Sequence, residues 1–199
     1  GPFVGGERRH ELQVVPALSV RVSPEIAAVP LASPRAPVEV RVFARSFALG
    51  PAEASVRLEA PSGWSVVPGS ASLRFSHDGE ETGTPFRVTP PRVLPAGTLV
   101  LRAVAVRDGR EHRDTVQAVE YDHVERRQLL RPAETRVLVL DVRTTPGVSV
   151  GYVMGSGDAV ADAIRQIGVP VTLLSADDLR FGDLGRFSTI VTGIRAYET

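Results

Sequence analysis

Residues 148–199 decide the fold class, and they read VSVGYVMGSGDAVADAIRQIGVPVTLLSADDLRFGDLGRFSTIVTGIRAYET. The pattern predicts a strand, a Gly-rich turn, a helix, a second strand, a short helix and a third strand. Parallel strands joined by helices form doubly wound sheets, which are covered on both faces and need more than about three strands to bury a core. The stretch therefore predicts an incomplete doubly wound, flavodoxin-like parallel α/β unit, and we expect the chain to be part of a longer polypeptide.

The helices of this stretch have recognisable ends. A first helix is predicted over residues 158–167, with one apolar face made of Val160, Ala163, Ile164 and Ile167. Gly168 follows it at the position where helices commonly end in left-handed backbone. Ser175 and Asp178 have the spacing of a capping box, which predicts the start of the second helix.

The preceding residues follow a different pattern, in which apolar and polar residues alternate over short runs such as VEVRV at 38–42. About seven such runs lie between Leu18 and Tyr121, separated by clusters of Pro, Gly and Ser. Alternation with a period of two is typical of antiparallel strands with one buried face. We therefore predict an immunoglobulin-like antiparallel β-sandwich over residues 16–125. Asp108-Gly109 predicts a tight hairpin turn within it.

The remaining segments complete the predicted organisation. Residues 1–15 form an N-terminal lead-in, residues 126–147 a charged connector, and residues 148–199 the truncated α/β unit. The connector contains an apolar strand at 136–142, RVLVLDV. This strand could close the sandwich or bridge to the next domain, and the sequence does not decide between the two.

The composition excludes several chemistries. The chain has no Cys, Lys or Asn, and all 23 of its basic residues are Arg, which is the pattern of a GC-rich genome. It therefore has no thiol nucleophile, Schiff-base lysine, cysteine zinc site or N-glycosylation site. The formal net charge is zero, so we expect no nucleic-acid partner. No apolar run approaches the length of about 20 residues that spans a membrane, and no signal-peptide pattern is visible.

A first candidate ligand site is the Gly155-Ser156-Gly157 turn between the first strand and helix of the α/β unit. Such turns hold phosphates or cofactors on helix N-terminal amides in doubly wound folds. The dinucleotide fingerprint, however, requires a third glycine where this chain has Val160, and Asp158 would repel a phosphate. A tight turn that lets strand and helix pack is the favoured interpretation.

A second candidate lies after the third strand, in Gly193-Ile194-Arg195-Ala196-Tyr197. The carboxyl ends of parallel strands form the binding edge of such sheets, so Arg195 and Tyr197 could bind an anion or a sugar. Packing of both side chains against the remainder of the domain is the favoured interpretation.

Trp64, the only tryptophan, could stack on a glycan, although packing within the sandwich is the favoured interpretation. The four histidines are scattered without metal-ligand spacing, and no nucleophile-elbow pattern is present. We therefore predict no catalytic residue and no metal ligands in this chain.

Two strings resemble a known family. GYVMGSGDAVADAIRQIGVPVTLL with the later GIRAY is similar to the C-terminal region of large bacterial PIG-L/LmbE-type deacetylases, where a degenerate glutamine-amidotransferase-like domain follows a β-sandwich. LEAPSGWSVVP, at 58–68, resembles the sandwich found beside carbohydrate-binding modules in α-galactosidases. The family's A-H-P-D-D and H-x-x-H zinc strings do not occur in this chain, so the resemblance carries over no catalytic residue.

The resemblance implies a non-catalytic accessory region of a zinc-dependent carbohydrate de-N-acetylase. Its role would be spacing, docking or weak glycan binding, and its partner would be the catalytic domain of the same polypeptide. It implies no cofactor in this chain, with zinc in the missing catalytic domain, and a secreted or extracytoplasmic location. The alternative is a small-molecule-binding α/β module that uses the turn after Val153 and the Arg195–Tyr197 edge.

Overall fold

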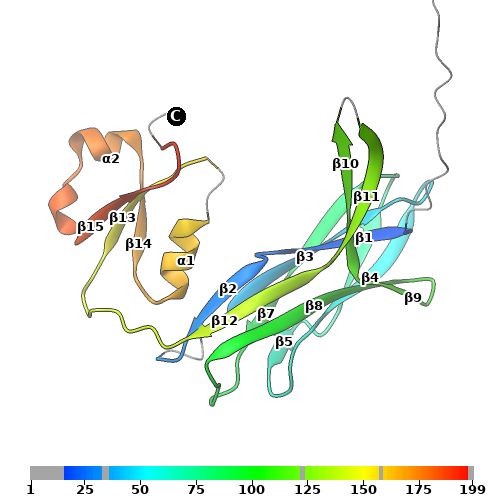
Figure 1. Ribbon diagram of the computed structural model, residues 1–199, viewed down its shortest axis with the longest axis horizontal. Helices are drawn as coiled ribbons and strands as arrows, with labels where there is room; N and C mark the ends of the chain where they lie inside the picture. The colour runs from blue at the N-terminus through cyan, green and yellow to red at the C-terminus, as the bar shows by residue number, and fades with distance from the viewer. Residues whose placement is uncertain (1–15, 33–35, 122–123, 157–158, 197–199) are drawn as a thin grey trace, which may run out of the picture.

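The computed structural model describes residues 16–32, 36–121, 124–156 and 159–196. Figure 1 shows two parts, a long β structure and a smaller unit in which helices flank a short sheet. A projecting ribbon rises from the β structure, on the right of Figure 1. Both parts follow from the change of sequence pattern near residue 148.

The β structure consists of two sheets. The first has the order β1 (Leu18–Ser23), β3 (Val38–Ser46), β7 (Glu81–Thr89), β5 (Ser65–Val67). The second has the order β2 (Ile26–Pro30), β12 (Glu134–Leu140), β8 (Gly97–Arg107), β4 (Ala52–Glu59), β6 (Ala71–Phe75), and β9 (Arg110–His112) also pairs with β8. Neighbours in both sheets are antiparallel except β2 and β12, which run parallel.

The core lies between the two sheets. Alternate residues of each strand point inward, as the sequence predicts, and the sheets contribute fully buried residues from both sides: Val20, Val40, Val42, Phe86 and Val88 from the first, Val56, Leu101 and Val137 from the second. Alternation of this kind, in two packed antiparallel sheets, is the architecture of an immunoglobulin-like sandwich, so that prediction is confirmed.

The boundary of the sandwich differs from the prediction. β12 falls within the segment 126–147 that the sequence suggests as a connector, yet it lies between β2 and β8 in the second sheet. Val137 and Val139 are 0% and 1% exposed, so the strand fills the core. The sandwich therefore extends to Leu140, because burial of these valines favours closure of the sheet over a bridge to the next unit.

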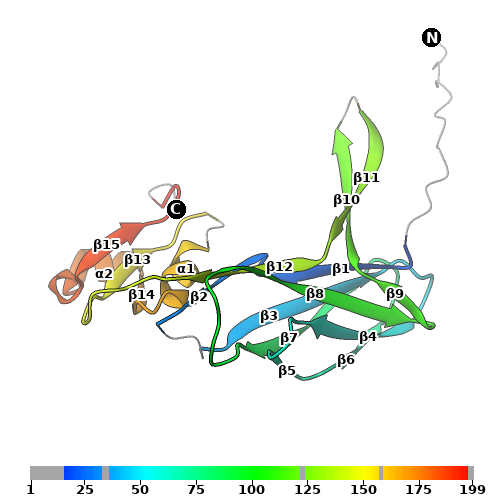
Figure 2. The ribbon, with the colours of Figure 1, turned by 60° about the horizontal axis from the view of Figure 1, so that its bottom comes forward.

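The projecting ribbon is β10 (Asp114–Tyr121) paired with β11 (Val124–Pro132), and Figure 2 shows it leaving the sandwich at a steep angle. It emerges where the neighbour of β8 changes from β9 to β12. Two bonds fix this branch point: the Ala133 amide donates to the Arg113 carbonyl at 2.8 Å, and the Ala103 amide donates to the Ala133 carbonyl at 2.9 Å. The Val116 amide also donates to Ser19 Oγ at 2.8 Å, which ties the ribbon to β1.

The predicted hairpin turn joins β8 to β9. Asp108 and Gly109 have φ angles of 51° and 74°. A type I′ turn between antiparallel strands has two consecutive positive φ values, and Asp-Gly is one of the sequences that adopt them readily.

The smaller unit is a three-stranded parallel sheet of order β14 (Val171–Leu174), β13 (Val150–Val153), β15 (Thr189–Thr192). The connections contain α1 (Val160–Gln166), α2 (Ala176–Phe181) and the short 3-10 helix η1 (Leu184–Arg186). The central strand is covered on both faces, and Tyr152 is fully buried. The outer strands are less covered, with Leu173 46% and Ile190 39% exposed.

The predicted helix ends are partly confirmed. Gly168 follows α1 with a φ of 90°, and Ser175 and Asp178 form the expected capping box. The buried face of α1 differs: Ala161 is buried, whereas Val160 is 43% exposed. Ala163, another residue of the predicted face, is also exposed.

Helix α1 also docks the smaller unit onto the sandwich, and it lies on the sandwich side of the parallel sheet (Figure 1). The backbone amide of Ala28, on the edge strand β2, donates to Gln166 Oε1 at 2.7 Å. Covering an edge strand with a helix satisfies its unpaired backbone groups and prevents edge-to-edge pairing. The docking therefore protects the free edge of the second sheet.

We expect truncation to test the corrected boundary. A chain of residues 16–142 should unfold cooperatively on heating, whereas residues 16–125 should show no cooperative transition, because they lack the strand that fills the core between β2 and β8. Far-UV circular dichroism against temperature measures both. A cooperative transition in the shorter chain would contradict the placement of β12 in the core.

Candidate functional site

The two candidate segments of the α/β unit meet at the carboxyl edge of the parallel sheet. Gly155 and Ser156 follow the central strand β13, and Gly193 to Arg195 follow its neighbour β15. The chain leaves β13 for β14 on one side and returns to β15 on the other. The loops after β13 and β15 therefore flank a topological switch point, where open α/β sheets bind ligands.

The two loops are bonded directly to each other. The Gly193 amide donates to the Val153 carbonyl at 2.8 Å, and the Ser156 amide donates to the Ile194 carbonyl at 3.0 Å. A Cβ atom at Gly155 would lie 2.2 Å from the Ile194 carbonyl oxygen. Gly155 therefore permits a close approach of two backbones, which agrees with the tight-turn interpretation.

The structure thus brings Gly155, Ser156 and Arg195 together, while Gly157 and Tyr197 lie outside the described residues. Arg195 has a left-handed φ of 57°, and the adjacent Ile194 is 68% exposed. Because the backbones close the gap between the loops, a ligand at this edge would have to lie over the loops rather than between them. Ligand binding by these residues stays a prediction.

Trp64 is half-buried and packs against the sandwich core. Its amide donates to the Pro61 carbonyl at 3.2 Å in a turn where Gly63 has a φ of 85°. The side chain is thus held by the core on one side, which matches the packing interpretation. Glycan stacking on Trp64 stays a prediction.

A charged cluster on the outer face of the second sheet does not follow from the sequence patterns. It consists of Arg57 and Glu59 on β4, Glu111 on β9, and Arg113 just after β9. Arg57 Nη2 donates to Glu59 Oε1 at 2.9 Å and to Glu111 Oε1 at 2.7 Å. Arg113 binds Glu59 with two nitrogens at 2.8 and 3.0 Å and Glu111 Oε2 at 2.8 Å. The four side chains form a closed ring of ion pairs.

The ring stabilises the charged form of each member. Hydrogen bonds from Arg113, then from Arg57, lower the pKa of Glu59. Hydrogen bonds from Arg57, then from Arg113, lower the pKa of Glu111. Both carboxylates thus stay ionised at neutral pH and are fully engaged, so the cluster is suited to fixing the sheet rather than to moving protons. The sequence gives only a faint indication of it, in the R-x-E of 57–59 and the E-x-R of 111–113.

Within the described segments the structure contains neither a cluster of metal-ligating side chains nor a helix suited to cross a membrane. Over 16–32, 36–121, 124–156 and 159–196, no three His, Asp or Glu side chains lie together as metal ligands would. None of the helices found there combines the length and apolar character of a membrane crossing.

Comparison with known proteins supplies no family. No protein-family profile and no curated protein sequence matches the chain. Among solved structures it is similar to WR4, an MSP family member of Caenorhabditis elegans, with a TM-score of 0.36 and 8% identity over 62% of this chain and 98% of that one. A FixG-related protein from Vibrio parahaemolyticus gives 0.39 and 8% over 63% and 98%. The Calx CBD1 domain gives 0.36 and 16% over 64% and 100%. TM-scores of this size assign no function to the chain.

Substituting Gly155 should loosen the carboxyl edge of the parallel sheet. In Gly155→Ala the new methyl group would overlap the Ile194 carbonyl, and overpacking of this kind costs about 1–3 kcal/mol. Hydrogen exchange at the Ser156 and Gly193 amides should accelerate, while the sandwich amides keep their rates. Ser156→Ala, which keeps both backbone bonds, is the control. Unchanged exchange in Gly155→Ala would contradict the close approach.

The ion-pair ring should make stability depend on acidic pH. Folding lowers the pKa of Glu59 and Glu111. Their contribution to the free energy of unfolding is therefore complete above the pKa of an unfolded Glu, about 4.3. It is lost as the pH falls through the lower pKa values of the folded state. Urea unfolding from pH 7 down to about pH 3 should therefore show wild type losing more stability than Glu59→Gln/Glu111→Gln.

The matched control is Glu39→Gln, which removes an exposed strand carboxylate for which the described residues provide no ion pair. It should leave the shape of the pH profile unchanged. Parallel profiles for wild type and the double variant would show that the ring does not stabilise the fold.

Proposed function

We propose that this chain is a non-catalytic accessory region of a larger PIG-L-type carbohydrate de-N-acetylase. In this role the sandwich acts as a spacer that holds the α/β unit in a fixed orientation against the catalytic domain. The family resemblance of the GYVMGSGD and GIRAY strings suggests the parent protein. The structure supports the spacer role through the docking of the two units.

The docking contact is the first support. Helix α1 lies against β2 and accepts the hydrogen bond from the Ala28 amide at Gln166. The segment between Leu140 and Val150 adds a covalent link beside this contact. Two attachments restrict the relative motion of the units more than a linker alone would, and a spacer needs this property.

The uncovered apolar surface of the α/β unit is the observation that carries the proposal. Its large exposed residues are Met154, Val160, Leu173, Leu179, Phe181, Ile190 and Ile194. Phe181 is 83% exposed at the end of α2, and Ile194 is 68% exposed after β15. These residues come from both edge strands, both helices and two loops, so the unit offers several separate apolar contacts to another polypeptide rather than one continuous patch. We assign the catalytic domain to that surface.

The alternative function is a small-molecule-binding module. The meeting of the loops after β13 and β15 at a switch point favours it. A ligand bound there stabilises only the native state, so nucleotides, sugars or carboxylates should raise the melting temperature. Arg195→Ala should abolish that increase if the ligand lies over the loops.

The docking role is tested by charging the apolar surface. Phe181→Asp and Ile194→Asp should each weaken binding to the catalytic domain of the parent polypeptide, produced separately, by about tenfold or more, because a carboxylate would have to be desolvated in the contact. Calorimetry measures the affinity. Leu49→Asp, at a sandwich residue that is 95% exposed, is the matched control and should bind like wild type.

Two outcomes would overturn the proposal. One is equal binding by all three variants and wild type. The other is deacetylase turnover by the purified chain with zinc and an N-acetylated sugar, retained after repurification and lost on substitution of residues in this chain.

A further inference from the structure

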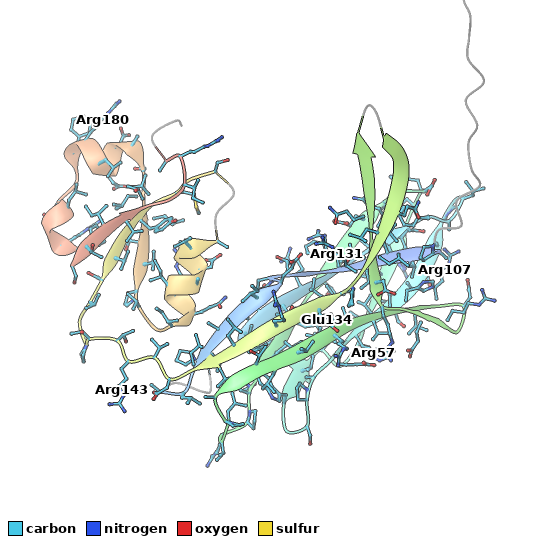
Figure 3. The ribbon with its side chains drawn as sticks, in the orientation of Figure 1. Arg57, Arg107, Arg131, Glu134, Arg143 and Arg180 are labelled. Atoms are coloured by element: carbon cyan, nitrogen blue, oxygen red, sulfur yellow. The ribbon has the colours of Figure 1, made fainter. Side chains whose placement is uncertain are left out.

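A cavity of about 560 Å³ lies at the foot of the β10–β11 ribbon. Its walls come from β1 and Glu25, just before β2, on one side, β10 on another, and the β11–β12 junction on the third. Figure 3 shows Arg131 and Glu134 at this junction, where the ribbon leaves the sandwich. The volume is within the range of about 300–1,000 Å³ that small-molecule sites occupy.

Three guanidinium groups line this cavity, and two of them are not committed to carboxylates. Arg21 is engaged, since its Nη2 donates to Glu81 Oε1 at 2.8 Å and its guanidinium lies 4.0 Å from the centre of the Phe43 ring. Arg131 and Arg136 form no ion pair with any residue that the structure describes. The cavity therefore presents two guanidinium groups whose donors are available.

The arginines on the neighbouring surface, unlike Arg131 and Arg136, form ion pairs with residues that the structure describes. Arg102, beside Arg136 on the outer face of the same sheet, binds Glu134 at 2.8 Å. Arg57 and Arg113 are occupied by the ring described above. Arg57, Arg102 and Arg113 are thus each paired with a carboxylate. At the cavity, Arg131 and Arg136 are two positive charges without such a partner among the described residues.

We propose that this cavity binds a saccharide that carries a carboxylate group. A guanidinium is a planar fork that binds a carboxylate through two parallel hydrogen bonds, so Arg131 and Arg136 would hold the acidic group. Glu25 and Gln117, which line the same cavity, provide acceptors and donors for ring hydroxyls. Pro132, an exposed residue of the same lining, gives an apolar surface against which a ring can lie.

The carboxylate of Glu25 favours a sugar over an acidic peptide. A peptide rich in Asp and Glu would bring several negative charges close to Glu25 and Glu134, which costs energy. A sugar acid brings one carboxylate to the arginines and neutral hydroxyls to the remaining groups. This site lies on the sandwich and does not depend on the accessory role proposed for the whole chain.

The test is titration of the complete chain with glucuronate, followed by NMR chemical shifts and calorimetry. Glucuronate should bind with its shift changes centred on Thr115, Ala133 and Arg136, whereas glucose, which lacks the carboxylate, should bind at least about tenfold more weakly, as expected for loss of hydrogen bonds to a charged group. Arg131→Gln and Arg136→Gln should each weaken glucuronate binding by a similar factor.

Arg41→Gln is the matched control, since Arg41 is an exposed strand arginine on β3 outside the cavity. It should bind glucuronate like wild type, and all three variants should melt at the wild-type temperature. Three results would overturn the proposal: equal binding of glucose and glucuronate, equal loss of affinity in Arg41→Gln, or tighter binding of an Asp-Glu peptide than of glucuronate.

Discussion

The two parts of the chain depend on one edge strand. β2 pairs in parallel with β12, which closes the second sheet, and on its other edge it donates the Ala28 amide to Gln166 of α1. Its inward residues Ala27 and Val29 are 0% and 1% exposed, so it also contributes to the core. A strand that joins sheet, core and helix cannot shift its register without disturbing all three, because a slip by one residue exchanges its buried and exposed faces. β2 therefore fixes the orientation of the α/β unit.

Local patterns predict most of the elements, whereas contacts between distant residues do not show in them. Alternation along β3, the Asp108-Gly109 turn and the Ser175–Asp178 capping box are visible in a few consecutive residues, and the structure confirms them. The place of β12 depends on its pairing with β2, more than 100 residues earlier, and an apolar run alone fits a closing strand or a bridge equally well. The point where the ribbon leaves the sandwich, at Arg113 and Ala133, also depends on a contact between residues distant in sequence and cannot be predicted from local patterns.

The candidate site shows the same limit. Gly155-Ser156 and Arg195 are identifiable because strand ends and Gly-rich turns have a known relation to binding edges. The contact between Gly155 and the Ile194 carbonyl, which closes the gap between their loops, is known only from the folded chain. The ion-pair ring joins residues 54 positions apart, and the cavity at the ribbon foot gathers residues from both ends of the sandwich sequence. The charged residues can be read from the sequence, but which Arg pairs with which Glu depends on how the strands lie together in the sheet.

The link between Leu140 and Val150 limits how far the units can separate. Nine residues lie between these positions, and a fully extended chain of that length spans about 30 Å. If α1 left β2, the α/β unit would remain confined to a small volume beside its docking surface. For a short flexible tether this confinement corresponds to an effective concentration in the millimolar range. A contact whose dissociation constant lies well below this concentration is occupied nearly all the time in this chain, so the tether reinforces the orientation that β2 fixes.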